Sequence, residues 1–244
     1  MAETNTIHVE HFTIRANEVD ASGNLTLPAI CNFFQEVAGN NAKALNFDIT
    51  DMHAKNLTWV VSRMDINIHK LPKWRESITI ETWPASGDSF RAYRNYRLLN
   101  AEGEELCNCL SYWMIISLES RRPVRIPDEV LNTRLTDRDH VTPVTNSRIR
   151  PFKEPESSKE IIVRRADMDM NEHVNNVRYL EWMLETITPK EARKIKKFDI
   201  AFLLETFVDA RISSEHKKTE QGLLGFQIMN NEGKAIALAQ ASID

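Results

Sequence analysis

An internal repeat constrains this chain more than any other feature, because two copies of one pattern imply two similarly folded units. In the first half, the polar segment Asp20–Asn24 precedes apolar residues spaced three to four apart over 27–45. In the second half, Asp169–His173 precedes a similar apolar series over 177–187. The two copies are offset by 149 residues, from 169 − 20. The apolar spacing predicts a long buried helix after each polar segment.

Residues with strong positional preferences mark the expected ends of both helices. Thr26 is an N-cap candidate, and Pro28 stands in the first turn of the first helix. The second helix is expected to begin near Asn175 or Asn176, and Pro189 is expected to stop it.

Strand-like runs follow each helix in the same order. They cover 60–69 and 77–83 in the first half, and 198–204 and 210–213 in the second. Residues 96–103 and 226–233 match as strands that enter an Asn-containing turn ending in glycine. The prediction is an α+β chain built from two copies of one unit, a long helix packed on an antiparallel sheet.

The expected domain organisation follows from the repeat. We assign residues 1–125 to an N-terminal unit, 126–158 to a connector and 159–244 to a C-terminal unit. Five prolines fall between 118 and 159, where hydrophobic periodicity is weak. A connecting segment of that length is expected to run over the surface.

Composition excludes several classes of function. The net charge of −4 argues against wholesale binding of nucleic acid, and the seven glycines form neither a dinucleotide fingerprint nor a P-loop. No apolar stretch approaches the roughly 18–20 residues that span a bilayer. The three cysteines are too few for a disulfide framework, and residues 1–12 show no export signal. A cytoplasmic protein without a membrane span or a nucleic-acid partner is expected.

The densest group of chemically active side chains lies in the second polar segment. Asp167, Asp169, Asn171 and His173 stand at every second position, so in an extended chain they would share one face. The helix that follows would add its positive N-terminal end. A carboxylate base, an amide, an imidazole and an anion-stabilising helix end suffice for hydrolysis by activated water.

Other interpretations of this segment stay open. An EF-hand calcium loop needs glycine at the sixth position and glutamate at the twelfth, where Glu172 and Arg178 stand. A transition metal would lack a second histidine nearby in the sequence, although ligands from elsewhere in the fold are conceivable. Helix capping explains aspartate and asparagine but not His173. No resident metal or cofactor is expected.

Cysteines and basic clusters have simpler expected roles. Cys107 and Cys109 share one face of a strand and are expected to pack as small buried hydrophobes. Solvated surface is the default interpretation of the basic residues. They form three clusters, Arg91, Arg94 and Arg97, then Arg121, Arg122 and Arg125, then Arg193, Lys194, Lys196 and Lys197.

The sequence resembles a known family of enzymes. Residues 167–182, read DMDMNEHVNNVRYLEW, resemble the signature of the acyl-acyl carrier protein thioesterases, the plant Fat-type enzymes and their bacterial relatives. The likeness extends to the first half, at 57–64, 72–74, 81–83, 119–122 and 126–127. It covers the chain from about Phe12 to the end.

This resemblance implies a double hotdog fold, of two tandem hotdog units, and a hydrolase of lipid metabolism. The implied reaction, in fatty acid biosynthesis, splits fatty acyl-acyl carrier protein into free fatty acid and holo-acyl carrier protein, without a cofactor. The family's catalytic aspartate, asparagine and histidine fall on Asp169, Asn171 and His173, and its glutamate falls on Glu205. Thr206 stands where plant members carry cysteine, which favours carboxylate-activated water over a cysteine nucleophile.

The repeat adds a consequence of its own. Ser22 and Asn24 stand in the first half at the positions of Asn171 and His173. One active site per chain is therefore expected, in the C-terminal unit, and the N-terminal unit is expected to house the acyl chain.

Partners and competing activities follow from the same expectations. Carrier proteins of this kind are acidic, so a basic cluster is expected to steer docking in a salt-sensitive manner. A monomer and a homodimer both fit two tandem units. Alternatives are an acyl-coenzyme A thioesterase, a hotdog hydratase or dehydratase, and a non-catalytic acyl-binding module.

Overall fold

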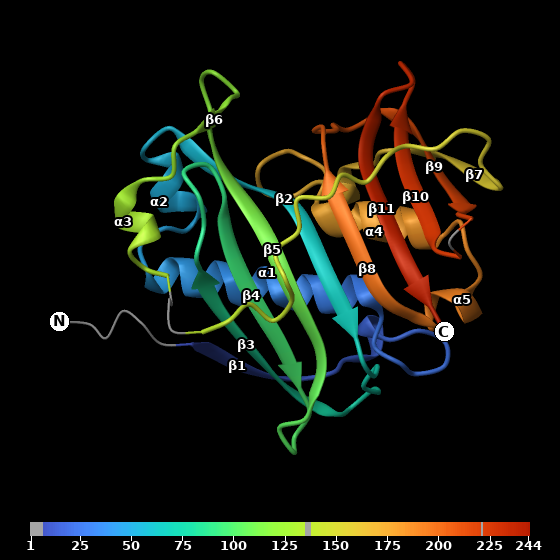
Figure 1. Ribbon diagram of the computed structural model, residues 1–244, viewed down its shortest axis with the longest axis horizontal. Coiled ribbons are helices and arrows are strands. Elements are labelled where there is room, and N and C mark those ends of the chain that lie inside the picture. Colours follow the sequence, from blue (N-terminus) through green and yellow to red (C-terminus); the bar gives the residue numbers. More distant parts are fainter. Residues whose placement is uncertain (1–6, 135–137, 221) are drawn as a thin grey trace. The chain divides into compact units, whose positions relative to one another are not determined.

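A helix packs against an antiparallel sheet in each half of the chain, in a computed structural model that describes residues 7–134, 138–220 and 222–244 (Figure 1). The chain divides into two units, Met1–Val144 and Thr145–Asp244. The predicted α+β architecture is confirmed in both. Residues 1–6, part of the segment in which we saw no export signal, lie outside the described residues.

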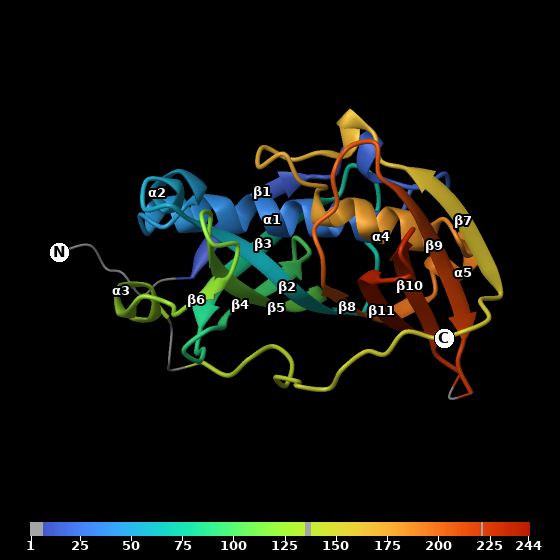
Figure 2. The ribbon, with the colours of Figure 1, turned by 90° about the horizontal axis from the view of Figure 1, so that it is seen from above.

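Unit 1 is a sheet with one long helix along it. The strand order is β1-β3-β4-β5-β2, and β6 pairs with β5. In Figure 2, α1 lies along one face of this sheet. The elements are β1 (His8–Thr13), η1 (Ala16–Glu18), α1 (Leu27–Ala44), α2 (Ile49–His53), β2 (Leu57–Ile68), β3 (Ser77–Ala85), β4 (Ala92–Leu99), β5 (Glu105–Ser117), β6 (Pro123–Val124) and α3 (Asp128–Leu131).

Unit 2 repeats this plan with a shorter helix. The strand order is β8-β11-β10-β9-β7, and α4 packs against β9 and β10. The elements are β7 (Ser157–Ile162), η2 (Arg165–Asp167), α4 (Asn176–Leu184), α5 (Pro189–Ala192), β8 (Ile195–Phe202), β9 (Arg211–Lys218), β10 (Leu224–Asn230) and β11 (Ala235–Ile243). No helix in the described ranges of either unit is both long and apolar enough to cross a membrane.

The first helix begins as its sequence predicts. The Thr26 side chain accepts a hydrogen bond from the Ala29 N–H at 3.3 Å, and Pro28 occupies the first turn. Phe34 of α1 stacks on Tyr96 of β4 with ring centroids 4.8 Å apart. Because strand side chains alternate between faces, this contact assigns Tyr96 to the α1 side of the sheet.

The second helix begins where expected but ends early. Asn175 is its N-cap, and the Asn175 side chain accepts from the Val177 N–H at 2.9 Å. The expectation that Pro189 stops this helix is wrong, because α4 already ends at Leu184. Thr188 instead caps α5 through a hydrogen bond from the Glu191 N–H, and Pro189 becomes the first residue of that new helix.

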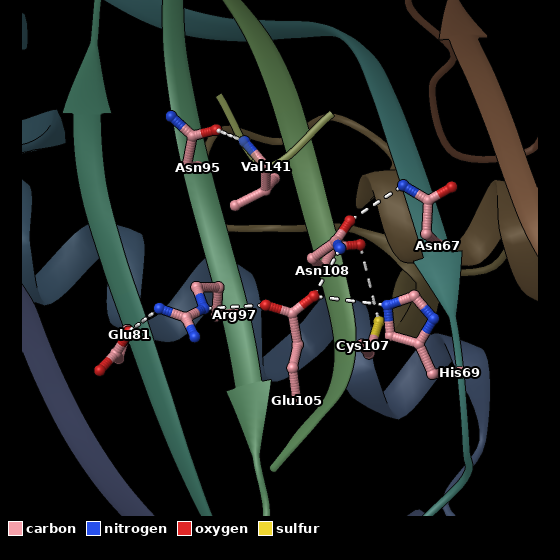
Figure 3. A network of polar contacts seen from close by, with 9 residues as sticks. All are labelled: Asn67, His69, Glu81, Asn95, Arg97, Glu105, Cys107, Asn108 and Val141. Atoms are coloured by element: carbon pink, nitrogen blue, oxygen red, sulfur yellow. Dashed lines mark hydrogen bonds and ion pairs between the residues drawn. The ribbon is translucent and has the colours of Figure 1, made fainter. Parts of the chain in front are cut away.

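The outer face of the unit 1 sheet, opposite α1, carries a polar network (Figure 3). Glu105 accepts from Arg97 at 2.8 Å and from Asn108 at 2.7 Å, and Asn67 donates to Asn108 at 2.9 Å. An open cavity of about 290 Å³ borders this network. Four of its six lining residues are charged, so it does not suit an alkyl chain; they are Trp83, Arg97, Glu105, Arg138, Asp139 and Val141.

Residues 138–142, which we call the strap, pack on that outer face. The Val141 N–H donates to Asn95 Oδ1 at 3.0 Å (Figure 3), and the Val141 side chain packs against a buried cluster that includes Trp83 and Tyr93. Further along, the Phe152 N–H donates to Gln227 Oε1 at 3.0 Å within unit 2. Two parts of the segment 126–158 are therefore attached to a sheet. Val141 is hydrogen-bonded to the sheet of unit 1, and Phe152 is hydrogen-bonded to the sheet of unit 2.

Candidate active site

The segment Asp169–His173 folds into a tight turn, which we call the site turn. The Asp169 N–H donates to the His173 carbonyl at 2.8 Å, and Asp169 Oδ1 accepts from the Asn171 and His173 N–H groups at 2.8 and 3.3 Å. The expected extended row is therefore wrong. An aspartate that can accept from backbone N–H groups two and four residues ahead favours a turn over a strand.

Asp167 lies apart from the chemistry of the site turn. It is 1% exposed, and Arg164 donates to it at 2.8 Å. This hydrogen bond and the positive charge of the guanidinium hold the pKa of Asp167 below its usual value. The pair closes the turn of η2 that leads into the site turn, so Asp167 has a structural role.

Unit 1 contains the same turn, made by the matching residues. The Asp20 N–H donates to the Asn24 carbonyl at 2.9 Å, and Asp20 Oδ1 accepts from the Ser22 and Asn24 N–H groups at 2.8 and 3.1 Å. The repeat predicted from sequence therefore extends to individual hydrogen bonds. Only the copy in unit 2 carries an imidazole on this turn, because Asn24 stands at the position of His173.

Glu205 approaches the site turn from the loop that follows β8. His173 Nε2 lies 3.9 Å from Glu205 Oε2, and both side chains are partly exposed. The Val174 N–H donates to the Thr206 carbonyl at 3.1 Å, which ties this loop to the end of the site turn. Phe207 packs edge-on against the His173 ring, with centroids 5.5 Å apart.

The four residues expected from sequence form a continuous chain of contacts. Asn171 Nδ2 lies 3.5 Å from Asp169 Oδ2, and the turn itself joins both residues to His173. Asp169 thus uses one carboxylate oxygen to build the turn and directs the other toward Asn171. The arrangement places a second carboxylate, Glu205, beside the imidazole.

Two buried polar atoms at this site lack hydrogen-bond partners in the described parts of the chain. They are Asn171 Oδ1 and Thr206 Oγ1. An unsatisfied buried acceptor typically costs about 1–3 kcal/mol, so such an atom calls for a water or a ligand. Among the described residues, Asn171 Oδ1 is therefore an acceptor available to a water or a ligand at this site.

Sequence reasoning missed the apolar rim of this site. Five exposed large hydrophobic side chains occur in the site turn and in the loop that bears Glu205. They are Met170, Leu203, Leu204, Phe207 and Val208. The apolar pairs Leu203–Leu204 and Phe207–Val208, on either side of Glu205, were the sequence signal that could have indicated this rim.

Neither metal nor thiol chemistry finds support among the described residues. Within 7–134, 138–220 and 222–244, no three His, Cys, Asp or Glu side chains group so as to hold a metal ion. Cys31, Cys107 and Cys109 are free and buried, and burial raises the pKa of each thiol. The prediction that Cys107 and Cys109 pack as buried hydrophobes is confirmed.

The three basic clusters differ in the contacts and the exposure of their side chains. Arg91 pairs with Asp88, Arg94 donates to Asn41, and Arg97 pairs with Glu105, so the first cluster is engaged within unit 1. Lys194 and Lys196 both contact Asp244 in unit 2. Arg121, Arg122 and Arg125 are all exposed, at the hairpin between β5 and β6 and just beyond it.

Two family models match the chain, one in each half. Residues 5–133 match the acyl-ACP thioesterase N-terminal domain, and residues 152–243 match the acyl-ACP thioesterase C-terminal domain.

Curated relatives are plant enzymes. The oleoyl-acyl carrier protein thioesterase 2 of Arabidopsis thaliana is 35% identical over 200 residues, which are 75% of this chain and 54% of that protein. The dodecanoyl-[acyl-carrier-protein] hydrolase of Cinnamomum camphora is 30% identical over 241 residues, 91% of this chain and 63% of that protein. The chain thus spans somewhat more than half the length of these relatives.

Solved structures share the fold over almost the whole chain. An acyl-ACP thioesterase from Bacteroides thetaiotaomicron superimposes with a TM-score of 0.90 at 23% identity and covers 100% of both chains. The 12:0-ACP thioesterase from Umbellularia californica superimposes with a TM-score of 0.87 at 23% identity and covers 98% of this chain and 97% of that one. The fold is a double hotdog, as the resemblance implied.

Proposed function

Because the chain belongs to the acyl-ACP thioesterase family, we propose that it hydrolyses fatty acyl-acyl carrier protein in fatty acid biosynthesis. The products are free fatty acid and holo-acyl carrier protein. The observation that carries this proposal is the contact of 3.9 Å between His173 and Glu205, together with a buried Asn171 oxygen that has no hydrogen-bond partner among the described residues. A carboxylate, an imidazole and an open acceptor form the minimum set for activating a water.

In the proposed mechanism, Glu205 removes a proton from a water that also donates to Asn171 Oδ1. The water oxygen then bonds to the thioester carbonyl carbon, and the carbon–sulfur bond breaks as the tetrahedral intermediate collapses. The proton passes from Glu205 through His173 to the leaving thiolate of phosphopantetheine. Asp169 holds the site turn through Oδ1 and orients Asn171 through Oδ2.

We assign the acyl chain to the N-terminal unit, 1–125, and catalysis to the C-terminal unit, 159–244, with 126–158 as the connector. The turn in unit 1 supports this division, because it carries Ser22 and Asn24 in place of the amide and the imidazole. No resident cofactor enters the mechanism.

Docking of the carrier protein is assigned to the exposed cluster Arg121, Arg122 and Arg125. An acidic carrier and a basic surface attract each other, and salt screens that attraction over about 8 Å at physiological ionic strength. The apparent KM for acyl-acyl carrier protein is therefore expected to rise with salt.

The cytoplasm is the proposed compartment, which three free cysteines support. Two tandem units are compatible with an active monomer or with a homodimer. Sedimentation velocity of the active protein distinguishes the two states.

Free-thiol release tests the reaction and its substrate together. The wild-type chain is given acyl-acyl carrier proteins from C8 to C18, beside the matching coenzyme A esters, at two salt concentrations. The proposal predicts a higher kcat/KM for the carrier-protein series and a KM that rises with salt. No thiol release from either series would reject the activity, and preference for coenzyme A esters would reject the carrier protein.

A further inference from the structure

Phe207 contacts the imidazole of the proposed site without being buried. Its ring meets the His173 ring edge-on, with centroids 5.5 Å apart and an interplanar angle of 73°. Phe207 is nevertheless 52% exposed, so it adds little to the core of unit 2. Burial of apolar surface therefore does not account for a phenylalanine at this position, and its contact with the imidazole needs another explanation.

Backbone hydrogen bonds hold the loop that bears Phe207 on both sides. Before it in the sequence, the Thr206 carbonyl accepts from the Val174 N–H at 3.1 Å. After it, the Asp209 N–H donates to the Val163 carbonyl at 2.9 Å, and Asp209 has a φ of 65° in the left-handed region. These bonds use no side chain, so they fix the backbone at position 207 beside the site turn whatever residue stands there.

Unit 1 builds the same loop. The Leu25 N–H donates to the Pro72 carbonyl at 2.8 Å, and the Arg75 N–H donates to the Ile14 carbonyl at 3.0 Å. Arg75 has a φ of 70°, close to that of its counterpart in unit 2. Leu25 and Ile14 stand at the repeat offset of 149 from the residues that make the two bonds in unit 2, from 174 − 25 and 163 − 14. Pro72 therefore takes the place of Thr206, and the two loops align residue by residue.

The side chains of the two loops differ where the proposed chemistry differs. Leu71 stands at the position of Glu205, and Lys73 stands at the position of Phe207. The turn of unit 1 also lacks the imidazole. The loop thus folds without an aromatic ring at this position, and the ring occurs in the copy that carries His173 and Glu205. This pairing indicates that Phe207 serves the imidazole and not the fold of the loop.

We propose that Phe207 is a positioning residue of the active site, which holds the His173 ring so that Nε2 faces Glu205. This inference rests on the proposed function and adds a residue to it. His173 Nε2 lies 3.9 Å from Glu205 Oε2, and the His173 side chain is 25% exposed. A partly exposed imidazole can rotate about its side-chain bonds, whereas an aromatic ring against it favours one orientation. The proposed proton transfer from Glu205 through His173 needs that orientation.

The role has consequences that an apolar contact with substrate lacks. A ring that positions the imidazole acts on the chemical step, so its loss lowers kcat and leaves KM unchanged. A side chain that only binds the apolar part of the substrate would act on KM instead. The phenyl ring also alters the magnetic field at the imidazole C–H protons, so the NMR resonances of His173 report the contact directly.

The test compares Phe207→Leu, which stays apolar but loses the ring, with Phe207→Tyr, which keeps the ring. In thiol release from acyl-acyl carrier protein, we expect Phe207→Leu to lower kcat by about 3- to 10-fold, the usual effect of one aromatic pair, with KM unchanged. Phe207→Tyr should retain the wild-type kcat. The His173 ring resonances, assigned with His173→Gln, should move in the leucine variant and stay close to their wild-type positions in the tyrosine variant.

The matched control is Lys73→Leu, at the same loop position in unit 1. It should keep the wild-type kcat and the wild-type His173 resonances, because unit 1 carries no imidazole on its turn. Thermal melting checks that all variants fold.

The outcomes separate this inference from the proposed function. If Phe207→Leu keeps the wild-type kcat while Glu205→Gln is inactive, the inference is wrong and the proposed function stands. A loss confined to KM, an equal loss of kcat in Phe207→Tyr, or unmoved His173 resonances in Phe207→Leu would also overturn the inference. If Glu205→Gln is itself fully active, both proposals fail.

Discussion

At the scale of single residues, position 172 shows how the two copies of the turn have diverged. Glu172 has a φ of 60°, in the left-handed region, whereas the matching Gly23 in unit 1 has a φ of 76°. Glycine adopts this conformation without the steric cost that a side chain adds. The copy with the proposed site therefore carries strain that the other copy avoids.

Replacing this glutamate by glycine is expected to stabilise unit 2. Relief of the left-handed strain outweighs the extra chain entropy of glycine, so Glu172→Gly should raise the free energy of unfolding by about 0.5–1 kcal/mol. Gly23→Ala is the reciprocal variant and should destabilise unit 1. Urea denaturation measures both, and a lower midpoint for Glu172→Gly would show that the carboxylate makes a stabilising contact of its own.

At the scale of elements, a histidine fastens the strap to the unit 1 sheet. Asn95 Oδ1 accepts from the Val141 N–H, so the Asn95 Nδ2 group points at His140 Nδ1, 3.4 Å away. That ring nitrogen must then be unprotonated, and Nε2 carries the proton toward Ser86 Oγ at 3.1 Å. Burial lowers the pKa of His140, and the nearby Asp139 opposes this only in part.

This histidine predicts a strap that loosens in mild acid. The folded state favours the neutral ring of His140. The contribution of this preference to stability is therefore complete at pH values above the unfolded pKa of about 6.5, and it is lost as pH falls below that value. Hydrogen exchange of the amides in 138–142, corrected for intrinsic rates, should be faster at pH 5 than at pH 7. The variant His140→Gln should lose this difference, and equal protection of the wild type at both pH values would contradict the assignment.

Element ends were only partly predictable from the sequence. Thr26 and Pro28 mark the start of α1 correctly, because capping depends on residues next to each other in the chain. Pro189 was misjudged, since proline suits the first turn of a helix as well as the position after one. The choice depends on Thr188 and Glu191, which complete a capping box that an apolar periodicity does not reveal.

At the scale of the whole molecule, the repeat was the most informative feature of the sequence. It predicts two α+β units and explains why Asp20 and Asp169 build the same turn. The extended row of Asp169, Asn171 and His173 could not be rejected from spacing alone, because spacing does not show that the Asp169 carboxylate accepts from the N–H groups two and four residues ahead. The presence of Glu205 at the site was expected only from the family resemblance, because a contact between segments far apart in the sequence leaves no periodic pattern.

The apolar rim was missed for the same reason, although its paired apolar residues stand in the sequence beside Glu205. An exposed Phe207 is an ordinary residue in its own segment. Its relation to the site depends on the hydrogen bond from Val174 to Thr206, which joins the loop to the site turn.

The central claim is that a single site in unit 2, with Glu205 as the base, hydrolyses acyl-acyl carrier protein. The most direct measurement is the turnover number for thiol release by Glu205→Gln and by the matched pair Asp169→Asn and Asp20→Asn, in which asparagine can still form each turn. The account predicts at least about a 100-fold loss for Glu205→Gln and Asp169→Asn, and wild-type turnover for Asp20→Asn. Near wild-type turnover in the two unit 2 variants, or equal losses for Asp20→Asn and Asp169→Asn, would contradict it.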